Sequence, residues 1–339
     1  MTILNVAYPF APVSLDAVGG AEQVLAMIDN GLVDAGVESI VIGAEGSRTR
    51  GVLIELPASQ IIDDDARSQT YHCYTQAILA TIAQRRVDLV HMHGVDFAHY
   101  IPDAGVPVLV TLHLPLDYYQ HPLIHWRHTV FNAVSEWQRR QCAVHIPVEL
   151  VCNGVDTEAL SPVSPKEDFV LALGRICPEK GFHLALDAAA YAGMNCILAG
   201  QVYGYADHRR YFSQEILPRL NGHRRFIGPA AGALKRRLLS AAKCVLIPSL
   251  VDESSSLVGM EALACGTPVV AFRRGALTEI VSHQRTGFLV DDVEQMAEAI
   301  RQVHDIDVHA CREDACQRFS AKQMVRNYLH LYKSILGTA

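Results

Sequence analysis

The fold is decided most clearly by residues 247–270, which read IPSLVDESSSLVGMEALACGTPVV. A short apolar run ends in a serine-rich loop, the loop opens a helical segment that stops at Gly266, and Pro268 opens the next apolar run. A strand, a helix and a second strand in this order predict a βαβ unit. In such a unit the strands are parallel and helices cover the faces of the sheet.

The same alternation extends along the whole chain. Ten apolar runs are expected to be strands: 3–7, 38–43, 88–92, 107–112, 148–152, 168–173, 195–199, 243–247, 268–272 and 286–290. Ten strands with crossovers are too many for one sheet of ordinary size, so the pattern predicts an α/β protein with two doubly wound parallel sheets.

A break between two domains is expected at 154–167, where prolines and polar residues interrupt the periodic pattern. The last segment, 320–336, has the pattern of a helix. The predicted domains are therefore 1–155, joined by the C-terminal helix at 320–339, and 165–319. The acidic triplet Asp63-Asp64-Asp65 is expected in an exposed loop.

The balance of charged residues differs between the two halves of the chain. The chain has 339 residues, 50% of them hydrophobic and 19% charged, which fits a globular protein and excludes a disordered one. Residues 1–150 carry 8 Lys and Arg against 16 Asp and Glu, whereas residues 151–339 carry 21 against 20. Without a basic excess, general nucleic-acid binding is not expected.

The nine cysteines form no C-x-x-C pair and several lie in apolar runs, which favours a reducing compartment over a disulfide framework. The chain enters an apolar run at Ile3 with no signal-peptide pattern, and no apolar stretch reaches the ~18 residues of a membrane span. The expected location is the cytoplasm.

Loops that follow strands are the expected ligand sites of such sheets. Gly19 and Gly20 precede the helix expected at 21–35, but they are not a G-x-G-x-x-G fingerprint, so a tight turn explains them as well as a ligand does. Arg175 and Lys180 bracket a proline turn and could converge on one polyanion.

The quoted stretch carries two carboxylates and three hydroxyls. Glu253 lies in the loop and Glu261 in the following helix, and carboxylates accept hydrogen bonds well from the vicinal hydroxyls of a sugar. Serines 254–256 can donate to anionic oxygens near the helix start. The alternatives are plain helix capping by the serines and a solvated helix face for Glu261.

With these motifs in view, the chain resembles the family-4 glycosyltransferases, which are retaining nucleotide-sugar enzymes of the GT-B fold. The likeness covers nearly the whole length. It rests on residues 19–22 (GGAE), His113, 153–156 (NGVD), Gly174-Arg175 to Lys180-Gly181, Glu253-x7-Glu261, 265–270 (CGTPVV) and 286–288 (TGF).

The resemblance implies two Rossmann-like domains facing a central cleft, with the donor held by the second domain and the acceptor mostly by the first. It also implies that the C-terminal helix crosses back to the first domain. By position, Arg175 and Lys180 would hold the donor diphosphate, Glu253 the sugar hydroxyls and Glu261 the ribose, while His113 would reach the sugar near the reacting centre.

The remaining donor contacts implied by the resemblance are Gly19 and Gly20 beside the phosphates, and Ser254, Ser255, Ser256 and Leu257 around the sugar. Many relatives have Gly-Phe-Gly in place of the three serines. The backbone amides survive that change but the pocket near the distal hydroxyls differs, so the identity of the donor sugar is left open.

The resemblance implies transfer of a hexosyl group from a nucleoside diphosphate sugar, with UDP and GDP favoured, to an acceptor hydroxyl of a saccharide, lipid or small molecule. No cofactor and no metal are expected. The alternatives are another GT-B chemistry, such as a nucleotide-sugar epimerase or a sugar phosphorylase, and a non-catalytic sugar-nucleotide binding protein.

Two other features allow competing interpretations. His91 and His93 share one face of a strand, with His99 nearby, but a structural role is favoured over a metal site because no third ligand has a suitable spacing. The segment 205–243 carries nine Lys and Arg, Lys235 among them. Solvated helix surface is favoured there over contact with membrane phospholipid, and the oligomeric state is not indicated.

Overall fold

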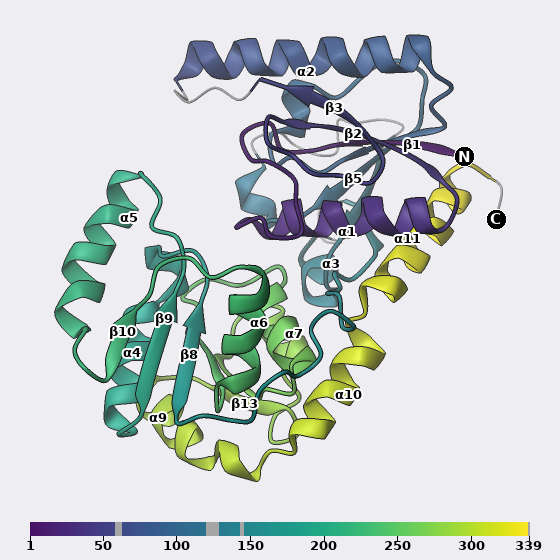
Figure 1. Cartoon of the computed structure of the whole chain (residues 1–339). Helices are drawn as coiled ribbons and strands as arrows, with labels where there is room; N and C mark the ends of the chain where they lie inside the picture. Colours follow the sequence, from purple (N-terminus) through teal and green to yellow (C-terminus); the bar gives the residue numbers. More distant parts are fainter. Residues whose placement is uncertain (58–62, 120–128, 143–145, 338–339) are drawn as a thin grey trace. The chain divides into compact units, whose positions relative to one another are not determined.

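The computed structural model describes residues 1–57, 63–119, 129–142 and 146–337 (Figure 1). The chain forms two compact units, Met1–Asn153 together with Ala321–Ala339, and Gly154–Ser320. Each unit is built on one parallel sheet with helices around it, so the predicted α/β class with two Rossmann-like sheets is confirmed.

The first unit has a sheet in the order β3-β2-β1-β4-β5-β6-β7. Its strands are β1 (Thr2–Val6), β2 (Glu38–Ala44), β3 (Val52–Leu56), β4 (Leu89–Met92), β5 (Val108–Leu112), β6 (Thr129–Ala133) and β7 (Glu149–Leu150). The strand order reverses between β1 and β4, which is where doubly wound sheets bind their ligands. The central strand β1 is buried along its whole length, as its run of apolar residues predicts.

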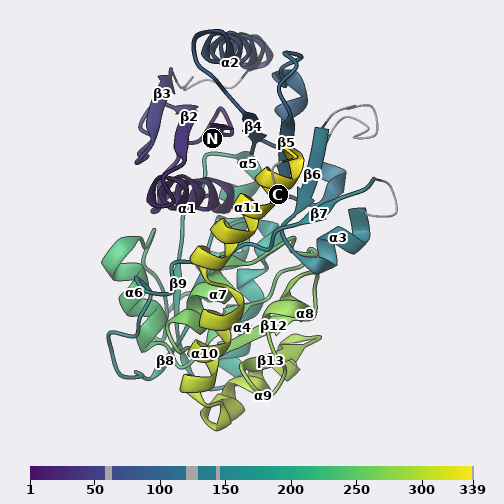
Figure 2. The ribbon, with the colours of Figure 1, turned by 90° about the vertical axis from the view of Figure 1, so that its right-hand side faces the viewer.

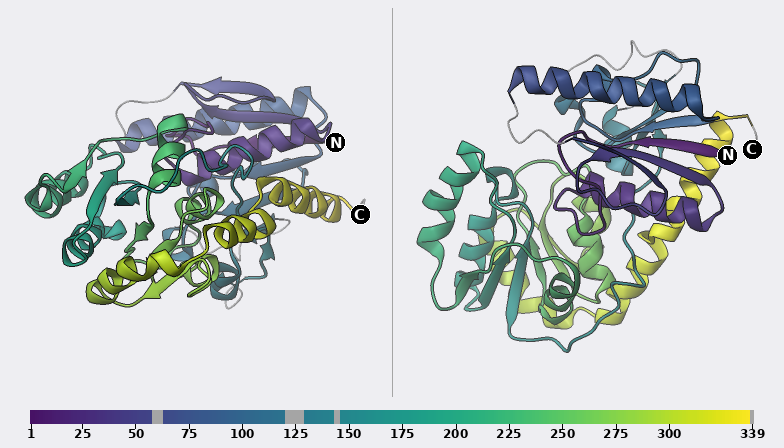
Figure 3. Two further views of the ribbon diagram at one scale, coloured as in Figure 1. Left: turned by 60° about the horizontal axis from the view of Figure 1, so that its bottom comes forward. Right: turned by 45° about the horizontal axis from the view of Figure 1, so that its top comes forward.

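Helices cover both faces of this sheet, with α1 and α2 on opposite sides (Figures 1 and 3). The helices of the unit are α1 (Gly20–Asp34), α2 (Asp64–Gln84), α3 (Glu136–Cys142) and α11 (Ala321–Ile335). Helix α11 packs directly on α1 (Figure 2), because a Cβ added at Gly31 would lie 2.5 Å from a methyl group of Val325. The C-terminal helix therefore belongs to the first unit.

The second unit has a sheet in the order β10-β9-β8-β11-β12-β13, with its reversal between β8 and β11. The strands are β8 (Phe169–Leu173), β9 (Asn195–Ala199), β10 (Arg224–Phe226), β11 (Val245–Ile247), β12 (Val269–Phe272) and β13 (Gly287–Val290). The helices are α4 (Phe182–Tyr191), α5 (Ala206–Tyr211), α6 (Gly232–Ala241), α7 (Leu257–Ala264), α8 (Leu277–Ile280), α9 (Val293–Gln302) and α10 (Val308–Arg318).

Three strands of the described residues were not expected from the sequence. β3 and β10 are the edges of their sheets and alternate exposed with half-buried residues, so they lack the continuous apolar run of a central strand. β6 is interrupted by the polar residue Asn132, which is buried and bonded to Thr111 and Tyr328. The strand expected at 148–152 is limited to Glu149–Leu150.

The segment 154–167 is not a free linker. The Val155 N–H donates to the Phe319 carbonyl at 2.7 Å, and Val155 and Leu160 are buried in the core of the second unit. The apolar side chains among its prolines explain this packing.

The acidic triplet was wrongly expected in a loop. Asp63 caps α2 by accepting from the Ala66 N–H at 2.8 Å, and Asp64 and Asp65 lie in the first turn. Negative charge is favourable there because the N-terminus of a helix is the positive end of its dipole. Within the described residues, no helix has both the length and the apolar character needed to cross a membrane.

Candidate functional site

The loops after β8 and β11 are in direct contact. The two strands are neighbours and parallel, so their carboxyl ends meet at the same edge of the second sheet. The Leu250 N–H donates to the Glu179 carbonyl at 2.8 Å, which joins the two loops. The edge at which the strand order reverses thus carries both sequence stretches that were expected to bind the donor.

Gly181 makes this close approach possible. Its φ of 62° is in the left-handed region, and a Cβ at this position would lie 2.3 Å from the Pro248 carbonyl oxygen. A side chain here would be strained and would collide with backbone, so only glycine fits between the loops.

Lys180 and Glu253 form an ion pair across this contact. The Lys180 Nζ lies 2.6 Å from Glu253 Oε1, and the Ser249 hydroxyl donates to the same oxygen. Glu253 is 9% exposed, so its charge is held in a buried setting by two donors. The cation and the carboxylate that the sequence assigned to one ligand therefore do lie side by side.

Arg175 is placed differently from Lys180. It is exposed and follows Gly174 at the end of β8. Its charge still reaches neighbouring groups, because the pKa of His208 is lowered first by burial and then by the positive charge of Arg175. The guanidinium is available to an anion at the same edge of the sheet.

Helix capping accounts for one of the three serines. The Ser256 hydroxyl accepts from the Gly259 N–H at 3.3 Å at the start of α7, of which Leu257 is the first residue. The hydroxyls of Ser254 and Ser255 are buried and have no hydrogen-bond partner among the described residues. Buried hydroxyls are usually paired, so these two are suited to a bound ligand.

Glu261 does not lie on a solvated helix face. It is 5% exposed and pairs with Lys235 of α6, whose Nζ lies 2.7 Å from its Oε1. Lys235 was expected among solvated charges, which is wrong for this residue because its side chain is only 14% exposed. Sequence reasoning missed Lys235 and Ser249, since nothing in their spacing links them to their carboxylate partners.

Gly19, Gly20 and His113 belong to the first unit. Gly19 has extended backbone and directly precedes α1, which begins at Gly20. His113 follows β5, and its Nε2 lies 3.0 Å from Nδ1 of His93. This contact holds the imidazole of His113 in one orientation at the end of the strand.

His91 and His93 serve the fold rather than a metal. Both ring nitrogens of His91 are engaged, one by the Tyr332 hydroxyl at 2.8 Å and the other by the Thr111 hydroxyl at 2.7 Å. His99 stacks on Tyr71 at a centroid distance of 4.7 Å. Among the described residues, none of these three histidines belongs to a group of potential ligands large enough to hold a metal ion.

The stability of the protein is expected to fall as the pH drops from 6.5 to 5. Burial lowers the pKa of His91 and His93 well below the usual value and that of His113 to about 4. The unfolded chain, with histidine pKa values near 6.5, then binds protons that the folded chain does not. Each such histidine lowers the free energy of unfolding by up to about 1.4 kcal/mol per pH unit, a slope that is approached below pH 6.5 and fades above it.

Thermal unfolding midpoints between pH 5 and 7.5 measure this effect. H113Q removes one proton-binding difference and should flatten the slope, whereas H309Q, at an exposed position, should leave it unchanged. A midpoint that is independent of pH from 6.5 to 5 would contradict the prediction.

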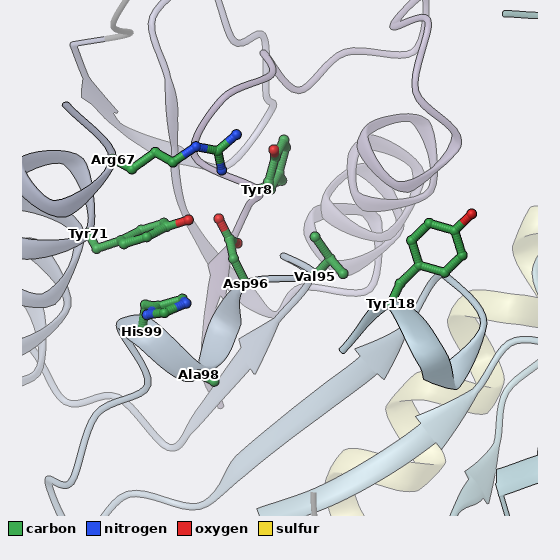
Figure 4. Close-up of a pocket in the computed structure, with 8 residues that line it drawn as sticks. All are labelled: Tyr8, Arg67, Tyr71, Val95, Asp96, Ala98, His99 and Tyr118. Atoms are coloured by element: carbon green, nitrogen blue, oxygen red, sulfur yellow. The ribbon is translucent and has the colours of Figure 1, made fainter. Parts of the chain in front are cut away.

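A small cavity of about 90 Å³ lies in the first unit, near the end of β4. Figure 4 shows that Tyr8, Arg67, Tyr71 and Asp96 converge on it, whereas Tyr118 lies to one side. Asp96 Oδ1 accepts from the Tyr100 hydroxyl at 2.7 Å. Its other oxygen, Oδ2, is buried and has no partner in the described part of the chain.

The cavity is lined by both a cation, Arg67, and a carboxyl group, Asp96. Arg67 lies over the ring of Phe10, with 5.3 Å between its Cζ and the ring centroid. Burial raises the pKa of Asp96, which marks a carboxyl group with little access to water. The arrangement offers a cation for an anionic substituent and a carboxyl oxygen for a hydroxyl group.

Two tyrosines follow His113 and have different surroundings. Tyr119 is buried, packs near Phe97 and accepts from the Leu114 N–H at 3.3 Å, whereas Tyr118 is 53% exposed at the cavity. The first domain was expected to hold the acceptor, and its segments 58–62 and 120–128 lie outside the described residues.

Family models match both halves of the chain. Residues 158–321 match the model described as glycosyl transferases group 1, and residues 18–159 match the model described as glycosyltransferase family 4. The matched ranges contain every residue assigned to donor binding above.

Named relatives and solved structures point the same way. The chain is 30% identical over half its length to a D-inositol 3-phosphate glycosyltransferase of Jonesia denitrificans, and spans 43% of that relative. It is 27% identical to the phosphatidyl-myo-inositol mannosyltransferase of Mycolicibacterium smegmatis, over 85% of this chain and 82% of the relative. An Anabaena protein solved with UDP and glucose has the same fold, with a TM-score of 0.78, 20% identity and coverage of 98% and 100%.

Proposed function

We propose that this chain, which belongs to the group 1 and family 4 glycosyltransferases of the GT-B fold, transfers a hexosyl group from a UDP- or GDP-linked sugar to a hydroxyl group of a phosphorylated polyol. The proposal includes retention of the anomeric configuration. It draws on the polar groups at the edge of the second sheet and on the cavity of the first unit.

The pairing of Lys180 with Glu253 carries the donor half of the proposal. A nucleoside diphosphate sugar presents phosphate oxygens next to sugar hydroxyls. This pair presents a cation that can bind a phosphate oxygen next to a carboxylate that can accept from a hydroxyl. The exposed Arg175 adds a second positive charge, and the unpartnered hydroxyls of Ser254 and Ser255 add two donors.

Charge development explains how these residues would accelerate the reaction. The bond between the anomeric carbon and the phosphate oxygen breaks, and negative charge grows on the leaving diphosphate. Lys180 and Arg175 stabilise that charge, which is larger in the transition state than in the bound donor. The acceptor oxygen attacks from the same face and its proton passes to the leaving phosphate, so neither a metal nor a protein nucleophile is required.

The acceptor half is supported by the cavity around Asp96. Oδ2 of Asp96, which has no partner among the described residues, can accept a hydrogen bond from a polyol hydroxyl, and Arg67 can bind a phosphate. The names of the two relatives, a D-inositol 3-phosphate glycosyltransferase and a phosphatidyl-myo-inositol mannosyltransferase, both specify a phosphorylated inositol. An inositol phosphate, free or lipid-linked, is therefore the first acceptor to test.

A two-stage experiment tests the proposal. Thermal shifts with UDP, GDP, ADP and their sugars identify the donor, because a ligand that binds the folded state raises the unfolding temperature. The donor so identified is then incubated with inositol, inositol 3-phosphate, phosphatidylinositol or inorganic phosphate, and the configuration of the new bond is read by NMR.

The expected result is an α-linked product from an α-linked donor, formed with the phosphorylated acceptors in preference to inositol. An inverted product would refute retention. Transfer that favours inositol over both phosphorylated forms would refute the acceptor class. A product formed only when inorganic phosphate is the acceptor would indicate a sugar phosphorylase instead.

A further inference from the structure

Three metal-ligating side chains meet where the loop that carries Arg175 and Lys180 contacts α5. The Cys177 thiol, a carboxylate oxygen of Glu179 and a ring nitrogen of His208 all lie within 4.8 Å of one another. Cys177 and Glu179 follow β8, whereas His208 comes from α5. The family resemblance implied no metal, and the spacing of these residues in the sequence does not reveal the cluster, because two of the ligands come from one loop and the third from a distant helix.

Two polar atoms of this cluster make no hydrogen bond with the described residues. Glu179 Oε2 and His208 Nδ1 are buried and have no hydrogen-bond partner among the described residues. His208 is 9% exposed, so its imidazole is held away from water. Two unpartnered polar atoms in one buried cluster indicate a missing ligand, since such atoms are otherwise paired in folded proteins.

The donor set selects the class of ligand. A thiolate, an imidazole and a carboxylate together suit Zn²⁺, whereas Mg²⁺ and Ca²⁺ prefer oxygen ligands alone. The thiolate and the carboxylate also supply two negative charges, which balance those of the divalent ion. Small rotations are required, because ligand atoms around a tetrahedral Zn²⁺ are roughly 3.5 Å apart.

We propose that Cys177, Glu179 and His208 form a site for one Zn²⁺ ion, with its fourth position open to water. On binding, the thiol loses its proton to solvent, a sulfur–zinc bond forms, and no oxidation or reduction takes place. The ion ties the diphosphate-binding loop to α5. The site takes no part in the transfer step described above.

Cobalt substitution in the full-length protein tests this site. Co²⁺ bound through a thiolate gives a sulfur-to-metal charge-transfer band in the near ultraviolet, and the band is expected to saturate at one ion per chain. Zn²⁺ should displace Co²⁺ and abolish the band, and excess Mg²⁺ should not. C177S should abolish the band, and H208Q and E179Q should each weaken Co²⁺ binding by at least tenfold.

Matched controls separate this site from surface binding. C316S and H309Q change exposed residues of the same unit and should leave the titration unchanged. Because Cys177 is buried, the unfolding midpoint of C177S is measured alongside, and the half-buried Glu179 gives an independent variant. Absence of the band in the wild-type protein, its persistence in C177S, or undiminished binding in both H208Q and E179Q would overturn the proposal. The titration uses no sugar nucleotide, so its outcome is independent of the proposed activity.

Discussion

Replacing Lys180 with alanine is expected to lower kcat/KM for transfer by about 100- to 1,000-fold, the usual loss when one donor to a developing negative charge is removed. The effect should fall mainly on kcat, because charge on the diphosphate grows as the glycosyl bond breaks. The unfolding temperature should fall, because the buried Glu253 keeps the Ser249 donor but loses its cation, so the kinetics are measured well below the unfolding transition. Steady-state kinetics with the identified donor measure the loss.

K243A is the matched control for this variant. Lys243 lies in the same unit and pairs with Asp168 at the surface, where its side chain is 41% exposed. Exposed pairs of this kind contribute little to stability or to distant chemistry, so its kinetics should equal those of the wild type. Wild-type activity in both K180A and K243A would contradict a role of Lys180 in the mechanism. An equal loss of activity in both variants would indicate a nonspecific effect of removing a positive charge.

Replacing Arg67 with alanine is expected to raise KM for a phosphorylated acceptor by about 10- to 150-fold, the equivalent of a charge-assisted hydrogen bond of 1.5 to 3 kcal/mol. The thermal shift produced by the donor should not change, because Arg67 belongs to the first unit and the donor-binding loops belong to the second. Kinetics with inositol 3-phosphate and with inositol, measured in parallel, separate the phosphate contribution from general damage.

R50A supplies the comparison for the first unit. Arg50 pairs with Asp34 at 2.6 Å, and both side chains are more than half exposed. Its replacement should leave KM for both acceptors unchanged. If R67A raises KM for inositol and for inositol 3-phosphate by the same factor, Arg67 does not bind the phosphate.

The pattern of apolar runs was sufficient to predict the class of fold and the position of most strands. Central strands such as β1 are buried on both faces and therefore read as unbroken apolar runs, whereas the edge strands β3 and β10 do not. Edge position depends on which strands pair, and pairing is a property of the folded sheet.

The candidate site was only partly predictable for a related reason. Glu253 and Glu261 could be singled out because they lie close together in a loop and helix after a strand. Their partners Lys180 and Lys235 come from other elements, and only the sheet topology brings them together. The cluster of Cys177, Glu179 and His208 depends in the same way on contact between a loop and a helix.

The first unit is discontinuous in the chain, and this has a consequence for how the protein is made. Tyr328 and Tyr332 of α11 are fully buried against the sheet, where their hydroxyls meet Thr111 and His91. During synthesis, residues 1–153 leave the ribosome before α11, so we expect the space that Tyr328 and Tyr332 fill to stay open until α11 has been made. The first unit is therefore expected to complete its core only after the second unit has been synthesised.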